Sequence, residues 1–313
     1  MIRRLVIAIL GLALLGGAGF WFLTNPALLP PPALPDAYQP DLANGEYVFY
    51  AGGCSSCHAA PGAKGEAKKL LVGGLSLKTD FGTFHVPNIT PDPNTGIGGW
   101  SAADFVTAMT RGVSPAGEHY YPAFPYTSYQ RMKVADLIDL KAFLDTLPAA
   151  TSEVPAHELG FPFNIRRGLG LWKLVYLDGR PFEPDARLGE VANRGAYLVS
   201  GPGHCSECHS PRDPLGGIDR GRAFSGAPSP EGDGRVPNIT PDPTGIGDWS
   251  EKDIVDALKT GFTPEFDSFG GSMVAVQENM AHLSDTDLAA IAAYLKSLPA
   301  IPSAPAPAAA QGG

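Results

Sequence analysis

The sequence predicts an all-α protein with two similar helical domains in tandem, behind one apolar helix at the N-terminus. Three observations support this. Much of the chain occurs twice, at an offset of about 150 positions. Apolar residues recur at helical spacing near the end of each copy, as at Leu137, Leu140 and Leu144. The N-terminus carries an uncharged run that is long enough to cross a bilayer.

The repeat is a duplicated domain, because only two widely spaced copies are present and a solenoid needs more. The offset is 150 at a Gly-x-Tyr pair, 151 at a cysteine motif and 149 at a Trp-Ser pair. The matched segments are Gly45 and Tyr47 with Gly195 and Tyr197, residues 54–58 with 205–209, Val86–Pro93 with Val236–Pro243, Trp100 and Ser101 with Trp249 and Ser250, and 136–148 with 287–299.

Each copy is expected to contain three main helices. One enters the cysteine motif, one begins at a Ser-x-x-Asp capping box, and the last stops at a proline. The expected ranges are 42–50, 101–110 and 134–147 in the first copy, and 191–200, 250–259 and 284–298 in the second. We interpret their apolar rows as ordinary core.

The N-terminal run Leu5–Leu23 has 19 uncharged residues, about 28 Å as a helix. It is either a membrane anchor or a cleaved signal peptide. A retained anchor is favoured, because the run is longer than a typical signal core, ends in Phe20-Trp21-Phe22 and shows no Ala-x-Ala site before Thr24. With Arg3 and Arg4 on the cytoplasmic side, the domains face the periplasm from the cell inner membrane.

The two Cys-x-x-Cys-His motifs carry the chemistry. On a helical turn the residues at i, i+3 and i+4 share one face, so two thiols meet the porphyrin vinyl groups while the imidazole ligates iron. The sequence therefore predicts two covalently attached c-type haems, at Cys54, Cys57, His58, Cys205, Cys208 and His209. A zinc site or a redox dithiol is the alternative, but both pairs are followed at once by His and no cysteine is left over.

Composition excludes other classes of function. The net charge is −9 and Lys and Arg are not clustered, which argues against nucleic acid as a partner. Gly and Pro make up 69 of the 313 residues, which indicates loop-rich domains that covalent haems would help to stabilise.

The chain divides into six predicted segments. These are an anchor or signal (1–24), a Pro-rich linker (25–40), the first domain (41–148), an interdomain segment (149–184), the second domain (185–300) and a disordered tail (301–313). The interdomain segment is rich in apolar and aromatic residues, so we expect it to pack between the domains and cover both haems.

Each copy resembles a small class I cytochrome c domain, with a Gly-x-Tyr helix, the haem motif and a terminal helix that crosses the first. The two Pro-Asn-Ile-Thr-Pro-Asp-Pro segments, Tyr121–Tyr126, and Gly203-His204-Cys205 followed by Pro211-Arg212 are similar to the cytochrome c subunits of periplasmic alcohol, aldehyde and related dehydrogenases. The resemblance covers about residues 41–300. Alcohol dehydrogenase subunits typically carry three haem motifs and this chain has two, so a separate dihaem relative is the other interpretation.

The sixth iron ligand in each domain must come from outside the motif, and Met and His are the usual candidates. In the second domain Met273 follows a Gly-rich loop eleven residues before the terminal helix, as in the class I cytochromes it resembles, and is the predicted ligand. Met280, or no protein ligand, is the alternative.

In the first domain the position that matches Met273 at the offset of 149 is Phe124, which cannot ligate iron. Met132 is the predicted metal ligand, although it aligns with Leu283, where an apolar residue can act as a hydrophobic staple. His119 is the second candidate, followed by Met109 or an open iron.

Residues around the ligands have weaker signals. Each haem-motif histidine should donate a ring N–H to a backbone carbonyl, and Pro61 and Pro211 resemble the prolines that supply it in related cytochromes. We interpret Pro87 and Pro237 as haem-wall residues. Candidates for haem propionate contacts, or otherwise surface charges, are Arg212, Arg235 and His85.

The predicted function is electron transfer, with no catalytic residues. A periplasmic dehydrogenase is the expected electron donor, and quinone, a soluble cytochrome or a terminal oxidase the acceptor. The alternative is a dihaem redox enzyme, either a peroxidase or a thiosulfate-oxidising cytochrome, with an open or unusually ligated iron in the first domain. A structural or haem-storage role is disfavoured, because the two repeats carry matching haem motifs.

Overall fold

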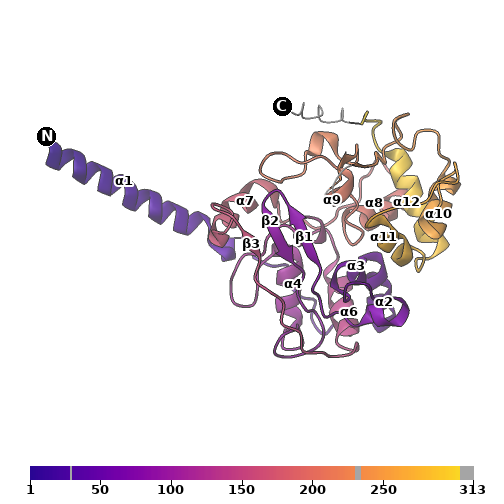
Figure 1. Cartoon of the computed structure of the whole chain (residues 1–313), viewed down its shortest axis with the longest axis horizontal. Helices are drawn as coiled ribbons and strands as arrows, with labels where there is room; N and C mark the ends of the chain where they lie inside the picture. Colours follow the sequence, from indigo (N-terminus) through magenta and orange to yellow (C-terminus); the bar gives the residue numbers. More distant parts are fainter. Residues whose placement is uncertain (29, 230–233, 304–313) are drawn as a thin grey trace.

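A computed structural model describes residues 1–28, 30–229 and 234–303. The long helix α1 (Ile2–Leu23) projects from a body made of two helical domains, as Figure 1 shows. Helix α1 has a mean hydropathy of 2.3 in its most apolar window and buries none of that window, so it is long and apolar enough to cross a membrane. The predicted two-domain helical fold behind an apolar helix is confirmed.

The two domains repeat one order of helices. The first contains α2 (Leu42–Ala51), α3 (Cys54–His58), α4 (Ala102–Arg111), α5 (Tyr126–Tyr129) and α6 (Val134–Leu144). The second contains α8 (Glu190–Ser200), α9 (Ser206–His209), α10 (Glu251–Thr260), α11 (Met273–Met280) and α12 (Asp285–Ser297). Short 3₁₀ turns are η1 (Pro26–Leu28), η2 (Gly65–Lys69), η3 (Arg166–Gly168) and η4 (Arg220–Arg222).

Small antiparallel sheets accompany the helices and were not expected from the sequence. In the first domain β1 (Ser76–Thr79) pairs with β2 (Gly82–His85), and β2 pairs with β3 (Glu158–Leu159). In the second, β4 (Ala227–Pro228) pairs with β5 (Arg235–Val236). The β1–β2 and β4–β5 hairpins each lie between the haem motif and the capped helix in the chain order, whereas β3 comes from the interdomain segment.

The predicted capping boxes are present in both copies. Ser101 accepts from the Asp104 N–H while the Asp104 carboxylate accepts from the Ser101 N–H, and Ser250 and Asp253 do the same. Each box satisfies two backbone N–H groups at a helix start.

The first and last helices of each domain cross in close contact at a glycine. A Cβ on Gly45 would lie 2.2 Å from the carbonyl oxygen of Asp139 in α6, and one on Gly195 would lie 1.8 Å from that of Ala290 in α12. No side chain fits at such distances, so the glycine of the Gly-x-Tyr pair sets how closely these helices pack.

Each domain has its own apolar core, and the two cores touch. The first is built around Leu137 and Leu144 of α6. The second is built around Leu288 and Ile291 of α12, and it also includes Ala51 from α2 of the first domain. The domains therefore pack directly on each other.

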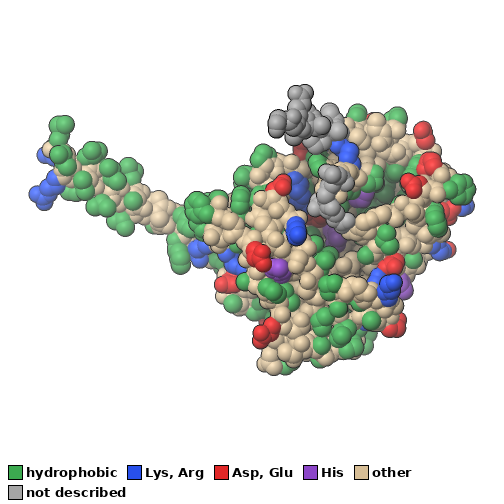
Figure 2. All heavy atoms as spheres, in the orientation of Figure 1, with side chains coloured by type: hydrophobic (Ala, Val, Ile, Leu, Met, Phe, Trp, Pro, Cys, Tyr) green, Lys and Arg blue, Asp and Glu red, His purple; other side chains and the backbone are tan. Residues whose placement is uncertain are grey.

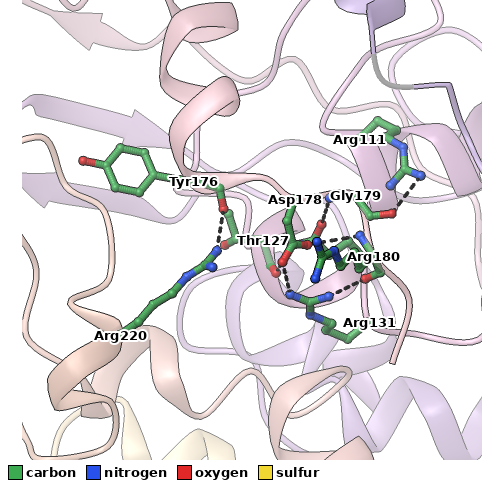
Figure 3. A network of polar contacts seen from close by, with 9 residues as sticks. Arg111, Thr127, Arg131, Tyr176, Asp178, Gly179, Arg180 and Arg220 are labelled. Atoms are coloured by element: carbon green, nitrogen blue, oxygen red, sulfur yellow. Dashed lines mark hydrogen bonds and ion pairs between the residues drawn. The ribbon is translucent and has the colours of Figure 1, made fainter. Parts of the chain in front are cut away.

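The interdomain segment contacts both domains through helix α7 (Leu169–Tyr176) and the loop after it. Trp172 Nε1 donates to the carbonyl of Leu215 at 2.9 Å. Figure 3 shows the loop network, in which Arg131 bonds Asp178 and the carbonyl of Arg180, each at 2.6 Å. The expectation that this segment packs between the domains holds only in part, because several of its apolar side chains are exposed: Phe161, Phe163, Ile165, Leu171, Leu174 and Val175.

The prediction of a disordered tail at residues 301–313 is wrong for its first three residues. The carbonyl of Ile301 accepts from Asn238 Nδ2 at 2.7 Å, and the Ser303 N–H donates to Thr244 at 2.9 Å. These residues are therefore held on the second domain. The rest of the predicted tail, from residue 304, lies outside the described residues.

Candidate functional site

The cysteine motifs form the short helices α3 and α9, as their spacing predicts. All four cysteines are free thiols; Cys54 and Cys205 are half-buried, whereas Cys57 and Cys208 are exposed. Desolvation by the surrounding protein raises the pKa of Cys54 and of Cys205 to about 12, so both are protonated at neutral pH.

Within the described part of the chain, the side chains around the cysteines do not gather into a metal-ion site. Among residues 1–28, 30–229 and 234–303, no three His, Cys, Asp or Glu side chains lie close enough together to hold one metal ion. Each motif therefore offers two thiols and one imidazole, which is the set that a c-type haem needs.

The proximal histidines are oriented by two carbonyls that the sequence reasoning assigned elsewhere. Nδ1 of His58 lies 2.9 Å from the carbonyl oxygen of Pro87, and Nδ1 of His209 lies 2.8 Å from that of Pro237. A carbonyl only accepts, so the proton sits on Nδ1 and Nε2 keeps its lone pair for iron. The expectation that Pro61 and Pro211 supply these carbonyls was wrong.

Burial supports the same protonation state. It lowers the pKa of both His58 and His209, although the bond to the proline carbonyl works against the shift. Neutral imidazoles with a fixed tautomer are suited to ligate iron through Nε2.

The repeated Pro-Asn-Ile-Thr segment holds the proline carbonyls in place. It bonds to the histidine on one side and to the end of the domain on the other. In the first copy Asn88 Nδ2 and Thr90 Oγ1 donate to the carbonyl of Ala150, at 2.8 and 3.0 Å. In the second copy Asn238 and Thr240 hold the carbonyl of Ile301 in the same way, at 2.7 and 3.1 Å. The buried amide fixes the segment, and the proline before it presents its carbonyl to the histidine.

In the second domain Met273, the predicted sixth ligand, is the first residue of α11 and is half-buried. The alternative Met280 ends the same helix and is 5% exposed in the apolar core. Met280 is thus a core residue, whereas Met273 has a side chain that the core does not enclose.

The first domain provides no equally placed methionine. Met132 is 2% exposed and packs in the core, near Gly201 of the second domain. Met109 is buried in the same core. His119 is held elsewhere, since its Nε2 lies 3.0 Å from the carbonyl of Thr24 at the end of α1. Phe124 packs edge-on against Tyr129, with ring centroids 5.7 Å apart.

The candidates for propionate contacts all have protein partners. Arg212 forms an ion pair with Glu207 at 2.6 Å, and His85 lies 3.4 Å from Glu158 and 3.1 Å from Ser76. Arg235 is in β5. Their role as propionate contacts stays a prediction.

The two haem motifs meet at the domain interface through the residues between their cysteines. Ser55 donates to Asn279 in α11 at 3.2 Å, and Asn279 donates to Ser56 at 3.0 Å. Across the interface Thr127 and Ser128 in α5 both donate to Glu207 at 2.8 Å. Each attachment helix is therefore held by the other domain.

The two exposed cysteines are also close to each other. Desolvation raises the pKa of Cys57, and the negative charge of a Cys208 thiolate adds to this shift. Cys57 and Cys208 therefore lie within range of each other's charge.

Aromatic side chains fill the space between the sites. Tyr129 lies edge-on to His204, the residue before Cys205, with ring centroids 5.5 Å apart. Burial raises the pKa of Tyr129 far above its ordinary value, and the thiolate charges of Cys54 and Cys57 and the Glu207 carboxylate contribute. Tyr129 thus lies near both motifs, and sequence reasoning missed it.

Comparison with known proteins gives the same family for both halves. A family model described as cytochrome c matches residues 42–148 and 192–299. The chain is 51% identical, over 96% of its length, to 99% of a "Diheme cytochrome c-type" protein of Cereibacter sphaeroides.

More distant relatives are subunits of dehydrogenases. The chain is 36% identical to the fructose dehydrogenase cytochrome subunit of Gluconobacter japonicus, covering 87% of this chain and 55% of the relative. It is also 36% identical to the alcohol dehydrogenase (quinone) cytochrome c subunit of Gluconobacter oxydans, covering 85% and 56%. The chain thus spans just over half the length of these two subunits.

Proposed function

Because this chain belongs to the cytochrome c family, as a dihaem cytochrome c related to the electron-transfer subunits of quinone-linked dehydrogenases, we propose that it is a membrane-anchored electron carrier. Its two domains imply two covalent c-type haems, whose irons supply reversible one-electron chemistry when bound. The proposed donor is a dehydrogenase outside the cytoplasm. The proposed acceptor is quinone, a soluble cytochrome or a terminal oxidase.

The observation that carries the proposal is that each attachment helix is held by the other domain. Asn279 accepts from Ser55 and donates to Ser56, which holds α3 on the second domain. Thr127 and Ser128 donate to Glu207, which holds α9 on the first. Fixed, adjacent attachment sites favour transfer between the sites over two independent reactions. Residues Cys54, Cys57, His58, Cys205, Cys208 and His209 would hold the haems, with Met273 as the sixth ligand in the second domain and Met132 as the candidate in the first.

The contacts at the end of α1 support a retained anchor. Thr24 is fully buried, its carbonyl lies 3.0 Å from His119 Nε2, and the guanidinium of Arg167 lies 3.6 Å from the ring centre of Trp21. Cleavage near Thr24 would remove these contacts from the folded body. The anchor proposal places both domains on the periplasmic side of the inner membrane.

One observation favours the alternative of a dihaem redox enzyme. In the first domain Met132 and Met109 are buried in the core, His119 is engaged at Thr24, and Phe124 occupies the position that matches Met273. This arrangement leaves an open first-domain iron as a candidate site for ligand chemistry.

Carbon monoxide distinguishes the two proposals. The full-length holoprotein is reduced with dithionite and its absorption spectrum is recorded before and after carbon monoxide is added. The carrier proposal expects no change at either haem on the time scale of minutes. Rapid binding of carbon monoxide at one haem would contradict the carrier proposal. If the Phe124→Met variant loses this binding and the Met273→Leu variant keeps it, the open iron is in the first domain and the enzyme is favoured.

The donor is tested separately. Affinity purification of the full chain from membranes of its own organism should recover a dehydrogenase, whose substrate should then reduce both haems. If a dehydrogenase is recovered but its substrate does not reduce the haems, the proposed donor is contradicted.

A further inference from the structure

Helix α7 has its apolar and charged faces reversed relative to an ordinary surface helix. Leu171, Leu174 and Val175 stand at i, i+3 and i+4 and are 42%, 50% and 68% exposed. These three side chains share one face, called here the α7 stripe. The opposite face, with Gly170 and Lys173, is buried.

The reversed orientation is fixed by the charged residue. The Lys173 ammonium donates to the carbonyl of Arg111 at 2.7 Å and to that of Gly112 at 2.6 Å, at the C-terminal end of α4. A cation there is favoured by the helix dipole, and it gives a donor to the carbonyl of Arg111 at the helix end. Rotation of α7 to bury the stripe would break both bonds, so the exposed apolar face is a built feature of the fold.

The α7 stripe adjoins the point where α1 enters the body. A Cβ on Gly170 would lie 2.4 Å from Cα of Thr24, so the two backbones are in contact. Leu174 and Leu23 line the same small cavity of about 20 Å³. Figure 2 shows hydrophobic and basic side chains gathered where the long helix joins the body.

Charge around the stripe is positive, although the whole chain carries −9. Residues 159–177 contain Arg166 and Arg167, besides the buried Lys173, and neither Asp nor Glu. Arg167 Nη2 donates to the carbonyl of Trp21 at 2.9 Å, which places this guanidinium at the level of the last turn of α1. Cations beside exposed apolar side chains suit anionic phospholipid headgroups.

We propose that the α7 stripe lies in the headgroup region of the same bilayer that α1 spans, so that the body is held to the membrane at two points. The inference rests on the proposed anchoring function of α1. A bilayer is the occupant because α1 enters the body beside the stripe, and the basic residues match its surface charge. Two attachment points fix how the haem domains are oriented over the membrane, which one flexible tether would not do.

Photo-crosslinking to lipid tests the inference with the full chain. The photoreactive amino acid p-benzoylphenylalanine replaces Leu12 in α1, Val175 in the stripe, or Val191 in α8, which are 70%, 68% and 56% exposed. Helix α8 lies on the far side of the body from α1 (Figure 1), so Val191 is the matched control. Each dihaem variant is placed in vesicles of phosphatidylethanolamine and phosphatidylglycerol that contain radiolabelled phosphatidylglycerol, and is then irradiated.

The inference expects lipid adducts at positions 12 and 175, with at least tenfold less at 191. Adducts at position 12 alone would overturn it while leaving the anchor in place. Adducts at none of the three positions would overturn both the inference and the anchoring function. Equal labelling at 175 and 191 would also overturn it, because contact with lipid would then not be specific to the stripe.

Discussion

The phenol of Tyr47 in the first domain donates a 2.5 Å hydrogen bond to the carboxylate of Asp287 in the second. In the reciprocal contact, the phenol of Tyr197 in the second domain donates to the carboxylate of Asp136 in the first. Each phenol also accepts from the backbone N–H three residues before its carboxylate, at 3.3 Å from Ser284 and 3.2 Å from Lys133. The interface is thus quasi-symmetric, like that of a two-fold dimer. It ties the helices that enter both haem motifs to the terminal helices.

Removal of the two phenols should have unequal costs. Asp287 keeps two bonds from Arg194, at 2.9 and 2.7 Å, when Tyr47 is lost. Among the residues that the structure describes, Asp136 keeps only a 3.0 Å bond from Asn44 when Tyr197 is lost. We expect Tyr197→Phe to lower the free energy of unfolding by about 1.5–3 kcal/mol and Tyr47→Phe by less than about 1.5 kcal/mol, measured by urea denaturation of the holoprotein.

Tyr38→Phe is the matched control, because that phenol in the linker donates to Asp139 of the first domain at 3.0 Å and does not cross the interface between the domains. It should leave the coupling of the two domains in unfolding unchanged, whereas the double variant of Tyr47 and Tyr197 should separate their transitions. A single transition in the double variant would contradict a role for this pair in joining the domains.

Acid should weaken the same interface. Desolvation opposes ionisation of Asp287, but bonds from Arg194 and Tyr47 outweigh it and hold its pKa below the ordinary 3.8. A carboxylate with a depressed folded-state pKa contributes stability above the unfolded pKa and loses it as pH falls through the folded value. Arg194→Gln should therefore cost more stability at pH 6 than at pH 3 in urea denaturation. An equal cost at both pH values would contradict this origin of the shift.

The sequence predicted the features whose residues are close together in the chain and missed those whose partners are far apart in it. The haem motifs, the capping boxes and the helix ranges are local patterns, and the structure places them as expected. The role of Pro87 and Pro237 was missed because a carbonyl carries no side-chain signal and lies 29 and 28 residues from its histidine.

The interdomain bonds were missed for a related reason. The repeat matches Tyr47 with Tyr197 and Asp136 with Asp287. These two matched polar pairs, on helices whose apolar rows were interpreted as core, were the available sequence signal. Nothing local says that each tyrosine reaches the carboxylate of the other copy. Likewise, the apolar content of α7 was visible, but its exposure depends on Lys173 reaching α4.

A methyl group at the helix crossing should prevent the second domain from folding. Gly195→Ala would place a Cβ 1.8 Å from the carbonyl oxygen of Ala290, and only a shift of α12 could relieve it. We expect a loss of more than about 4 kcal/mol, seen as loss of the second-domain haem signal in purified protein. Gly189→Ala, with open space around its Cβ at the start of the same helix, should cost about 1 kcal/mol or less.

Substitution of methionine tests the sixth ligands domain by domain. Met273→Leu keeps volume and removes the sulfur, so we expect one haem to lose its sulfur-to-iron absorption band and to shift to lower potential, with little loss of stability. Met132→Leu should do the same to the other haem if Met132 ligates. An unchanged spectrum for Met132→Leu would assign this side chain to the core alone.

Alkaline pH should stabilise the protein through the buried lysine of α7. Burial lowers the pKa of Lys173 to about 7, from 10.5 in the unfolded chain. Between these values the unfolded state binds more protons than the folded state, so this group makes stability rise with pH from about 7 towards 10. Lys173→Met should flatten that rise, measured as urea midpoints at pH 7, 8.5 and 9.5. A parallel rise in wild type and variant would show that other groups cause it.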